Sequence, residues 1–259
     1  MVRLHPMAVF GLLKEFRGVT SDQGPIVIAG PRLLVETLRG ELARDGEPGA
    51  VKVGAIDGAT ALVLVLAAPP AEEDERLLKQ AHRKRIPIVC VLAGPEAEGG
   101  RIPFVLATDI VRVPAGSGFP IDEIARSLAR RLGDDGTSLA ARLPRLRQAV
   151  SDEFIRTFSR KAGLLGVAVF VPGADLPALT LLQLRLVLRI GAAHGVEINR
   201  ERLPEILAVI GSGLAFRAAA RQTLGFIPVA GWLLKGAIAY AGTKALGEAA
   251  VRYFATRAA

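Results

Sequence analysis

The feature that most constrains the fold is a run of seven apolar residues, Ala61-Leu-Val-Leu-Val-Leu-Ala67. A run this short and continuous is typical of a strand buried on both faces, since a half-buried strand alternates apolar with polar side chains. Comparable runs predict further strands. They are expected at Ile26–Ala29, 51–55 and Ile88–Leu92, and as shorter runs at 104–106 and 110–113.

Amphipathic helical patterns separate these strands, at 32–44, 72–84 and Ile121–Leu132. Strands that alternate with helices predict a doubly wound, mostly parallel sheet covered on both faces. Ligands of such α/β folds bind at the carboxyl ends of the strands. The turns after Ala29, Leu66 and Leu92 are therefore the expected places for chemistry.

Strand patterns end near the turn-rich segment Gly133-Asp-Asp-Gly136. We therefore expect an α/β domain followed by an all-α helical domain. The expected divisions are an amphipathic lead segment at 1–24, the α/β domain at 25–133, a junction and helix start at 134–150, and a basic, apolar helical domain at 151–259.

Charge is divided unevenly along the chain. Residues 1–136 carry 17 Lys and Arg against 18 Asp and Glu, whereas 137–259 carry 16 against 7, so the net charge of +8 comes from the C-terminal part. A basic, apolar region with few aromatic residues suits an anionic lipid surface better than a nucleic acid, which needs stacking aromatics or a reading motif. The single cysteine, Cys90, excludes an intrachain disulfide and favours a reducing cytoplasm.

The turn after the first expected strand reads Gly30-Pro-Arg-Leu-Leu-Val-Glu-Thr37 and aligns in part with the phosphate-binding pattern GxxxxGK[ST]. Gly30 and Thr37 are kept, but Val35 stands in place of the second glycine and Glu36 in place of the lysine. That glycine lets backbone N–H groups approach the phosphates, and the lysine neutralises their charge. A Val side chain would obstruct the ligand and a carboxylate would repel it.

In order and spacing this half resembles an Era-like P-loop GTPase. In that family a base-reading NKxD segment follows the strand expected at Ile88–Leu92. The corresponding residues here are Ala93, Gly94, Pro95 and Glu96, with only a carboxylate in the fourth place.

The other family motifs are mostly missing. Asp57-Gly58 is too short to match the metal-contacting DxxG, whereas the segment 113–124 is similar to the last loop and helix start of the family. We expect no catalytic residues, no metal site and no resident cofactor, with GTP or GDP binding left open. An ordinary small α/β domain with Pro31 in the first helical turn is the alternative.

The apolar stretches of the helical region are shorter than a membrane span. The longest uncharged ones, 162–174 and 222–234, have 13 residues each, whereas a spanning helix needs about 18 or more. They fit buried core helices, hairpins that dip into one leaflet, or oligomer interfaces.

Basic and aromatic residues beside these stretches favour contact with anionic lipid. The residues expected to make it are Arg156, Arg160, Lys161, Arg185, Arg189, Trp232 and Lys235. A solvated arginine face over a helical core is the alternative. Another pattern recurs every four residues on the last helix and predicts a stripe against which a second helix packs. It consists of Ala237, Ala241, Ala245 and Ala249.

The most distinctive runs of the helical region lie between 140 and 255. They are Val171-Pro-Gly-Ala-Asp-Leu-Pro, Leu184-Arg-Leu-Val-Leu-Arg-Ile, His194-Gly, Glu201-Arg-Leu-Pro-Glu, Phe216-Arg-Ala-Ala-Ala-Arg-Gln, Phe226-Ile-Pro-Val-Ala-Gly-Trp and Tyr240-Ala-Gly-Thr-Lys-Ala-Leu-Gly-Glu. Together they resemble a bacterial helical domain of unknown function that commonly follows Era-like GTPase domains. The resemblance implies a membrane-associated helical module partnered with a GTPase domain.

We therefore expect a non-catalytic, GTPase-like scaffold or regulatory protein in the cytoplasm, at the inner face of the plasma membrane. Its expected partners are the lipid surface and a protein such as an intact GTPase, and no nucleic acid. Two alternatives remain: an active nucleotide-dependent enzyme of the GTPase family that needs a partner, and a soluble homo-oligomer packed through its apolar helices.

Overall fold

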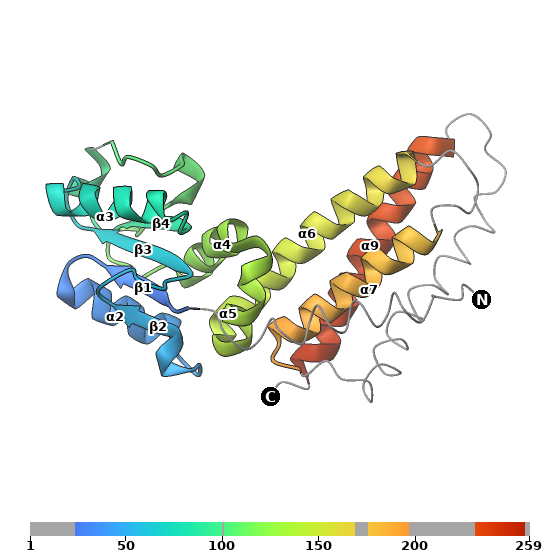
Figure 1. The fold of residues 1–259 in the computed structure, drawn as a ribbon, viewed down its shortest axis with the longest axis horizontal. Coiled ribbons are helices and arrows are strands. Elements are labelled where there is room, and N and C mark those ends of the chain that lie inside the picture. The colour runs from blue at the N-terminus through green and yellow to red at the C-terminus, as the bar shows by residue number, and fades with distance from the viewer. Residues whose placement is uncertain (1–23, 100, 169–175, 197–230, 257–259) are drawn as a thin grey trace. The chain divides into compact units, whose positions relative to one another are not determined.

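The computed structural model describes residues 24–99, 101–168, 176–196 and 231–256, and element labels follow Figure 1. The chain divides into two compact units, one of residues Ser21–Val150 and the other of Ser151–Ala259 with Met1–Thr20. The division falls inside one helix, α6. The lead segment expected at 1–24 lies, apart from Gly24, outside the described residues.

The first unit contains a five-stranded sheet in the order β2-β1-β3-β4-β5. The strands are β1 (Ile26–Ala29), β2 (Val51–Val53), β3 (Ala61–Leu66), β4 (Ile88–Leu92) and β5 (Ile110–Arg112). Every pairing is parallel. The chain runs outward from β1 to β2 on one side and from β3 to β5 on the other, so the winding direction reverses between β1 and β3. The expected α/β architecture is therefore present.

Four α-helices belong to the described part of this unit. They are α2 (Arg32–Leu42), α3 (Glu72–Arg83), α4 (Ile121–Leu132) and α5 (Gly136–Arg142), with short 3-10 helices η1 (Pro48–Ala50), η2 (Pro95–Gly99), η3 (Ala107–Asp109) and η4 (Gly133–Asp135). Figure 1 shows α2 and α3 on opposite sides of the sheet. That arrangement follows from right-handed crossovers that leave β1 and β3 in opposite directions.

The uninterrupted apolar sequence of β3 has a direct structural reason. Successive side chains of a strand point to opposite faces, so Leu62 and Leu64 pack beneath α3 while Val63 and Val65 point to the other face. All four side chains are fully buried. A strand covered on both sides has no position that solvent would favour for a polar residue.

The connection between β4 and β5 differs from the sequence prediction. No strand forms at 104–106, and among its described residues the connection contains only the 3-10 helices η2 and η3. Ala97, Ile102 and Val105 instead pack into the core cluster beneath α3. This irregular segment covers the part of the sheet where a crossover helix would usually lie, because three apolar side chains fill that space.

The junction expected at 134–150 belongs structurally to the first unit. Leu139, Leu143 and Leu146 are fully buried. Arg142 donates hydrogen bonds to both carboxylate oxygens of Glu47, at 2.8 and 3.2 Å. This interaction holds the pKa of Glu47 below its ordinary value. The turn-rich segment at Gly133 therefore marks the end of the alternation of strands and helices, but the compact unit continues beyond it.

The second unit is described through three helices: α6 (Pro144–Ala168) from Ser151 onward, α7 (Leu176–Ala193) and α9 (Gly231–Ala255). A hydrogen bond between the buried side chains of Gln183 and Thr243, 3.0 Å long, joins α7 to α9. No helix among the described residues combines the length and the apolar character that crossing a membrane requires.

Helices α6 and α9 cross at glycine. A methyl group placed on Gly236 would lie 2.5 Å from Cγ2 of Val167 and 3.0 Å from the carbonyl oxygen of Gly163. One placed on Gly166 would lie 3.0 Å from the carbonyl oxygen of Lys235. These distances leave no room for side chains, so the glycines allow the two backbones to approach closely.

Candidate functional site

A cleft lies at the carboxyl ends of β1 and β3, where the winding of the sheet reverses. Its volume is about 580 Å³. It is lined by Ala29, Gly30, Pro31, Val65, Leu66, Ala67, Ala68, Pro69, Ala71, Glu73, Asp74 and Leu77. Ligands of doubly wound folds bind at this position, so the cleft is the first candidate site of the molecule.

The structure requires glycine at position 30 whether or not a ligand binds. Its φ is +130°, and a Cβ atom at this position would lie 2.2 Å from the carbonyl oxygen of Val65. A side chain would collide with the backbone of β3. Only glycine allows the chain to leave β1 here.

The other residues of the degenerate phosphate motif lie inside α2. The helix begins at Arg32, with Pro31 at its N-cap, so only Gly30 and Pro31 separate it from β1. Val35 is buried and does not line the cleft. The prediction that its side chain would obstruct a ligand is therefore wrong: Val35 helps bury the apolar face of α2.

Glu36 and Thr37 are exposed on the same helix. Glu36 pairs with Arg39 at 2.7 Å, an ion pair within α2. The Thr37 hydroxyl donates to the carbonyl oxygen of Leu33 at 2.9 Å, which is a helical side-chain interaction and not the geometry of a metal ligand. Neither side chain lines the cleft.

The electrostatics of the cleft disfavour phosphate. The amino end of α2 offers an anion roughly half a positive charge. Glu73 and Asp74 line the same cleft, and no Lys or Arg of the described residues lines it. One carboxylate oxygen of Asp74 accepts a hydrogen bond from the backbone N–H of Ala71 at 2.9 Å and so caps α3. Two full negative charges outweigh the helix end, so the cleft is a poor place for a nucleotide.

The residues that replace the base-reading motif follow β4. The backbone N–H of Ala93 donates to the carbonyl oxygen of Leu66 at 2.8 Å and continues the sheet pairing. Gly94 has φ +134°, and Glu96 is exposed. Ala93, Gly94 and Glu96 do not line the cleft. Asp57, of the Asp57-Gly58 pair that is too short to match DxxG, is paired with Lys84.

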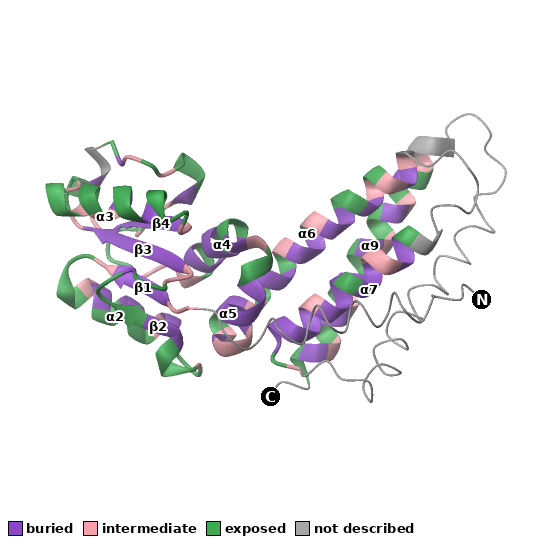
Figure 2. Cartoon of the chain, in the orientation of Figure 1, coloured by how far each residue is buried: buried purple, intermediate pink, exposed green. Residues whose placement is uncertain are grey.

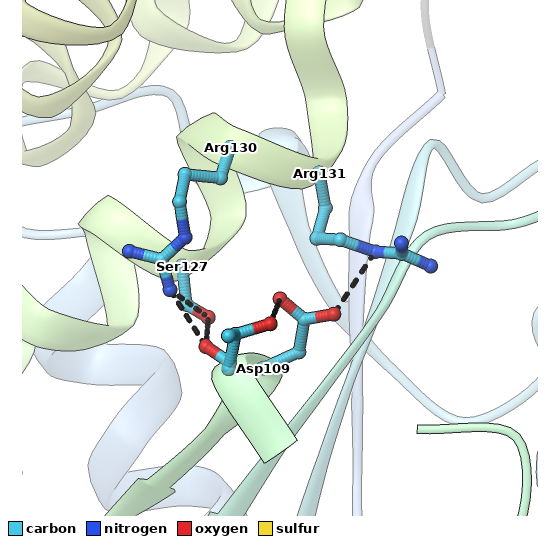
Figure 3. A network of polar contacts seen from close by, with 5 residues as sticks. Asp109, Ser127, Arg130 and Arg131 are labelled. Carbon is cyan, nitrogen blue, oxygen red and sulfur yellow. Dashed lines mark hydrogen bonds and ion pairs between the residues drawn. The ribbon is translucent and has the colours of Figure 1, made fainter. Parts of the chain in front are cut away.

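Sequence reasoning missed a polar network on the other side of the first unit, shown in Figure 3. Asp109 is buried, and its Oδ2 lies 3.4 Å from Nε of Arg131 in α4. Arg130 donates to the carbonyl oxygen of Thr108 at 2.7 Å and to the Ser127 hydroxyl at 3.2 Å. In the sequence, this network is indicated by a single acidic residue, Asp109, between two apolar runs. The network holds α4 against the start of β5.

The residues expected to bind lipid divide into two groups. Arg156 makes a bidentate interaction with Glu153, with contacts between 2.6 and 3.0 Å, so its charge is largely satisfied. The guanidinium of Arg189 lies 5.6 Å from the ring centroids of Phe154 and Phe158 and packs against α6. Both side chains take part in the structure of the helical unit.

The remaining basic residues, Arg160, Lys161, Arg185 and Lys235, are exposed. Trp232 lies at the start of α9, but its side chain is outside the described part of the structure.

Two exposed apolar side chains that the sequence analysis did not single out lie in the same part of the helical unit as Arg160. Leu164 is 70% exposed and Tyr240 is 39% exposed. A methyl group on Gly163 would lie 3.4 Å from Cβ of Tyr240, so these side chains belong to one region of α6 and α9.

The alanine stripe lies on a different face of α9 from the one that packs within the described unit. Ala237, Ala241 and Ala245 are exposed and Ala249 is half-buried. Figure 2 shows that α9 carries both buried and exposed positions along its length. Gly236 and Gly247 make the close contacts instead: a methyl group on Gly247 would lie 2.5 Å from Cγ1 of Ile155. Among the described residues of α9, burial follows Gly236, Ala239, Thr243, Leu246 and Ala250. The packing of a second helix on the alanine stripe stays a prediction.

Among the described residues, no group of three or more His, Cys, Asp and Glu side chains is placed to hold a metal ion. Comparison with known proteins finds no family model that matches the chain and no matching curated protein.

Proposed function

We propose that the protein is a GTPase-like scaffold without nucleotide turnover, attached to the inner face of the cytoplasmic membrane by its helical unit. The observation that carries the first part is the cleft between β1 and β3. A phosphate-binding loop needs several free backbone N–H groups and a cation, whereas α2 begins two residues after β1 and the cleft is lined by Glu73 and Asp74. An Era-like ancestry fits the parallel sheet with a ligand position at this edge. The partner would then be a protein such as an intact GTPase.

Fluorescence anisotropy with labelled GDP and GTP in the presence of Mg²⁺ tests the nucleotide part. We expect no saturable binding at micromolar protein. Low-micromolar binding with phosphate release that is lost in Thr37→Ala would instead make the protein an active GTPase-family enzyme. Val35→Gly with Glu36→Lys is a second variant, and we expect it to gain no binding, because both positions lie inside α2.

The membrane part is supported by the surface of Arg160, Lys161, Leu164, Lys235 and Tyr240, called the α6–α9 surface below. Arg160 and Leu164 are four residues apart on α6 and so share a face. All five side chains are exposed. Each basic residue contributes about 1 kcal/mol at an anionic lipid surface, and burial of Leu164 adds about 1–2 kcal/mol. The sum is on the order of 5 kcal/mol, which corresponds to reversible attachment.

Flotation of the full chain with vesicles tests this surface. We expect flotation with phosphatidylglycerol vesicles and little with phosphatidylcholine vesicles. Because the attachment is weak, Leu164→Glu or the pair Arg160→Glu and Lys161→Glu should abolish it. Leu33→Glu is the matched control, since Leu33 is 80% exposed but lies on α2 of the other unit. Equal flotation of all variants would contradict the proposed surface.

A second candidate is a homo-oligomer formed through α9. It is favoured by the exposed positions Ala237, Ala241 and Ala245, which share a face and would let another helix approach closely. Sedimentation equilibrium of the native chain and of Ala241→Arg distinguishes it. A dimer that the substitution dissociates, together with absence of flotation, would favour this candidate over the membrane proposal.

A further inference from the structure

Two exposed apolar side chains lie close together on the connection between β4 and β5. Phe104 is 46% exposed and Leu106 is 60% exposed. Ile102 and Val105 of the same segment pack into the core beneath α3. The packing of Ile102 and Val105 therefore fixes the segment on the core, while Phe104 and Leu106 remain at the surface. The connection runs from residue 93 to residue 109. Long connections without an α-helix usually have a function of their own.

Phe104 is held in an unusual conformation. Its φ is +65°, a left-handed value that is unfavourable for a bulky residue. Its ring stacks on the imidazole of His82 in α3, with centroids 4.8 Å apart and the planes 26° from parallel. Strain of this kind persists where the surrounding structure enforces it, and it concentrates at functional positions. Here it fixes a large apolar side chain in position without burying it.

Basic residues flank this aromatic pair along the chain. Lys79 lies three residues before His82 on α3 and so shares its side of the helix, and Arg83 follows His82 directly. Arg101 precedes Phe104 by three residues. All three basic side chains are exposed, and none of them forms an ion pair with another described residue. The carboxylates of α3 lie in its first turn, and the last of them, Glu75, is four residues before Lys79.

We propose that Phe104, Leu106 and His82, bordered by Lys79, Arg83 and Arg101, form a docking surface for an acidic protein segment that places an apolar side chain against Phe104. The proposal rests on the scaffold function and specifies the chemistry of its partner. Rigid aromatic side chains dominate protein interfaces because little conformational entropy is lost when they bind. The basic border steers an acidic partner and rejects a basic one. A lipid surface would gain nothing from fixing the ring in a strained position.

The test uses the full chain and short fluorescent peptides that share their Leu and Phe positions. The peptides carry Glu, Ser or Lys at all other variable positions, and binding is measured by fluorescence anisotropy. The acidic peptide should bind at least about ten-fold more tightly than the neutral one, and the basic peptide should bind most weakly. Phe104→Ala should weaken binding of the acidic peptide by about ten-fold or more. Lys79→Ala with Arg101→Ala should reduce its preference over the neutral peptide.

Leu33→Ala is the control, since it removes from α2 an apolar side chain that is 80% exposed, more than Phe104 at 46%, and it should leave peptide binding unchanged. Equal affinity for the three peptides, or acidic-peptide binding that survives Phe104→Ala, would overturn the proposal. Tighter binding of a single-stranded RNA than of the acidic peptide, lost in Phe104→Ala, would assign the surface to nucleic acid and also overturn it.

Phe104→Gly separates docking from folding. Glycine adopts a left-handed φ without strain, so the melting temperature should stay within a few degrees of the native value although the anchor is lost. Peptide binding should fall as in Phe104→Ala. A variant that keeps both its stability and its binding would overturn the proposal. No membrane or nucleotide enters these measurements, so their failure is distinguishable from failure of the flotation or nucleotide tests.

Discussion

At the scale of single residues, the candidate cleft shows that a residue can match a motif because backbone packing requires it, and not because it serves the function of the motif. Gly30 occupies the first position of a phosphate-binding pattern, yet its φ of +130° and its proximity to the carbonyl oxygen of Val65 already require glycine. Val35, at the position of the second glycine, lies in α2 and is buried. Both identities follow from packing at the end of β1.

The requirement for glycine at position 30 leads to a stability prediction. Gly30→Ala should lower the free energy of unfolding by more than about 2 kcal/mol, because the methyl group meets backbone atoms that cannot move away. Gly40→Ala, in the same region of the chain, should raise it by about 0.5–1 kcal/mol, since Gly40 lies inside α2. A methyl group on Gly40 would have no atom within 4 Å. Urea unfolding of both variants gives the comparison, and equal effects would contradict it.

Cys90 gives a second prediction at this scale. Burial in β4, with the negative charges of Asp74 and Asp109 as smaller causes, raises the pKa of its thiol from 9.0 to about 12. The folded protein holds this proton more tightly than the unfolded chain does. The resulting contribution to stability is complete below pH 9.0 and is lost as the pH rises toward about 12.

Labelling with Ellman's reagent at pH 8 measures the consequence for reactivity. The native protein should react very slowly, since the thiolate is the reactive form and is absent. The same protein in guanidinium should react at once, and the signal is unambiguous because the chain has a single cysteine. Rapid labelling of the native protein would contradict the burial of this thiol.

At the scale of elements, two sets of side-chain contacts hold parts of the α/β unit in place: those of the β4–β5 connection and those of α4. The irregular β4–β5 connection covers the sheet with Ile102 and Val105 in place of a crossover helix. Helix α4 is fixed to the end of that connection by Asp109, Arg130 and Arg131 (Figure 3). The position of α4 therefore depends on polar groups as well as on its apolar face.

Asp109→Ala tests this dependence. The side chain of Asp109 is 3% exposed and that of Arg131 is 37% exposed, so the arginine can regain water when its partner is removed. We expect a loss of about 2 kcal/mol in unfolding free energy, less than the 3–5 kcal/mol typical of a fully buried pair. Glu36→Ala breaks a pair in which both side chains are nearly half exposed, and it should cost less than about 0.5 kcal/mol. A similar small effect for both variants would show that the network does not hold α4.

At the scale of the whole molecule, the candidate surfaces are divided between the two units. The α/β unit contains the acidic cleft and the surface around Phe104, and the helical unit contains the α6–α9 surface. All of the excess positive charge lies in residues 137–259, with 16 Lys and Arg against 7 Asp and Glu. In the proposed function, one unit recognises a protein while the other reaches a lipid surface.

The salt dependence of vesicle flotation is the prediction at this scale. Raising NaCl from about 0.1 M to about 1 M shortens the screening length from ~10 Å to ~3 Å, so flotation with anionic vesicles should decline steeply. Leu164→Glu should fail to float at every salt concentration, because it loses the apolar contact as well. Flotation of the native chain that is independent of salt would contradict an electrostatic contribution.

The sequence by itself determined most strands and helices of the α/β unit, although the strand expected at 104–106 does not form. β1, β4 and α4 coincide with the predicted ranges, and α2, α3 and β3 end within two residues of theirs, because apolar periodicity reports directly which side chains can be buried. Only the tertiary structure decided which residues meet. It placed Val35 in the core, turned Ala237 and Ala241 outward, brought Phe104 onto His82 and buried Asp109 beside Arg131. Periodicity fixes the face of an element, whereas contacts between distant segments depend on how those faces pack together, and that packing is not written in any local pattern.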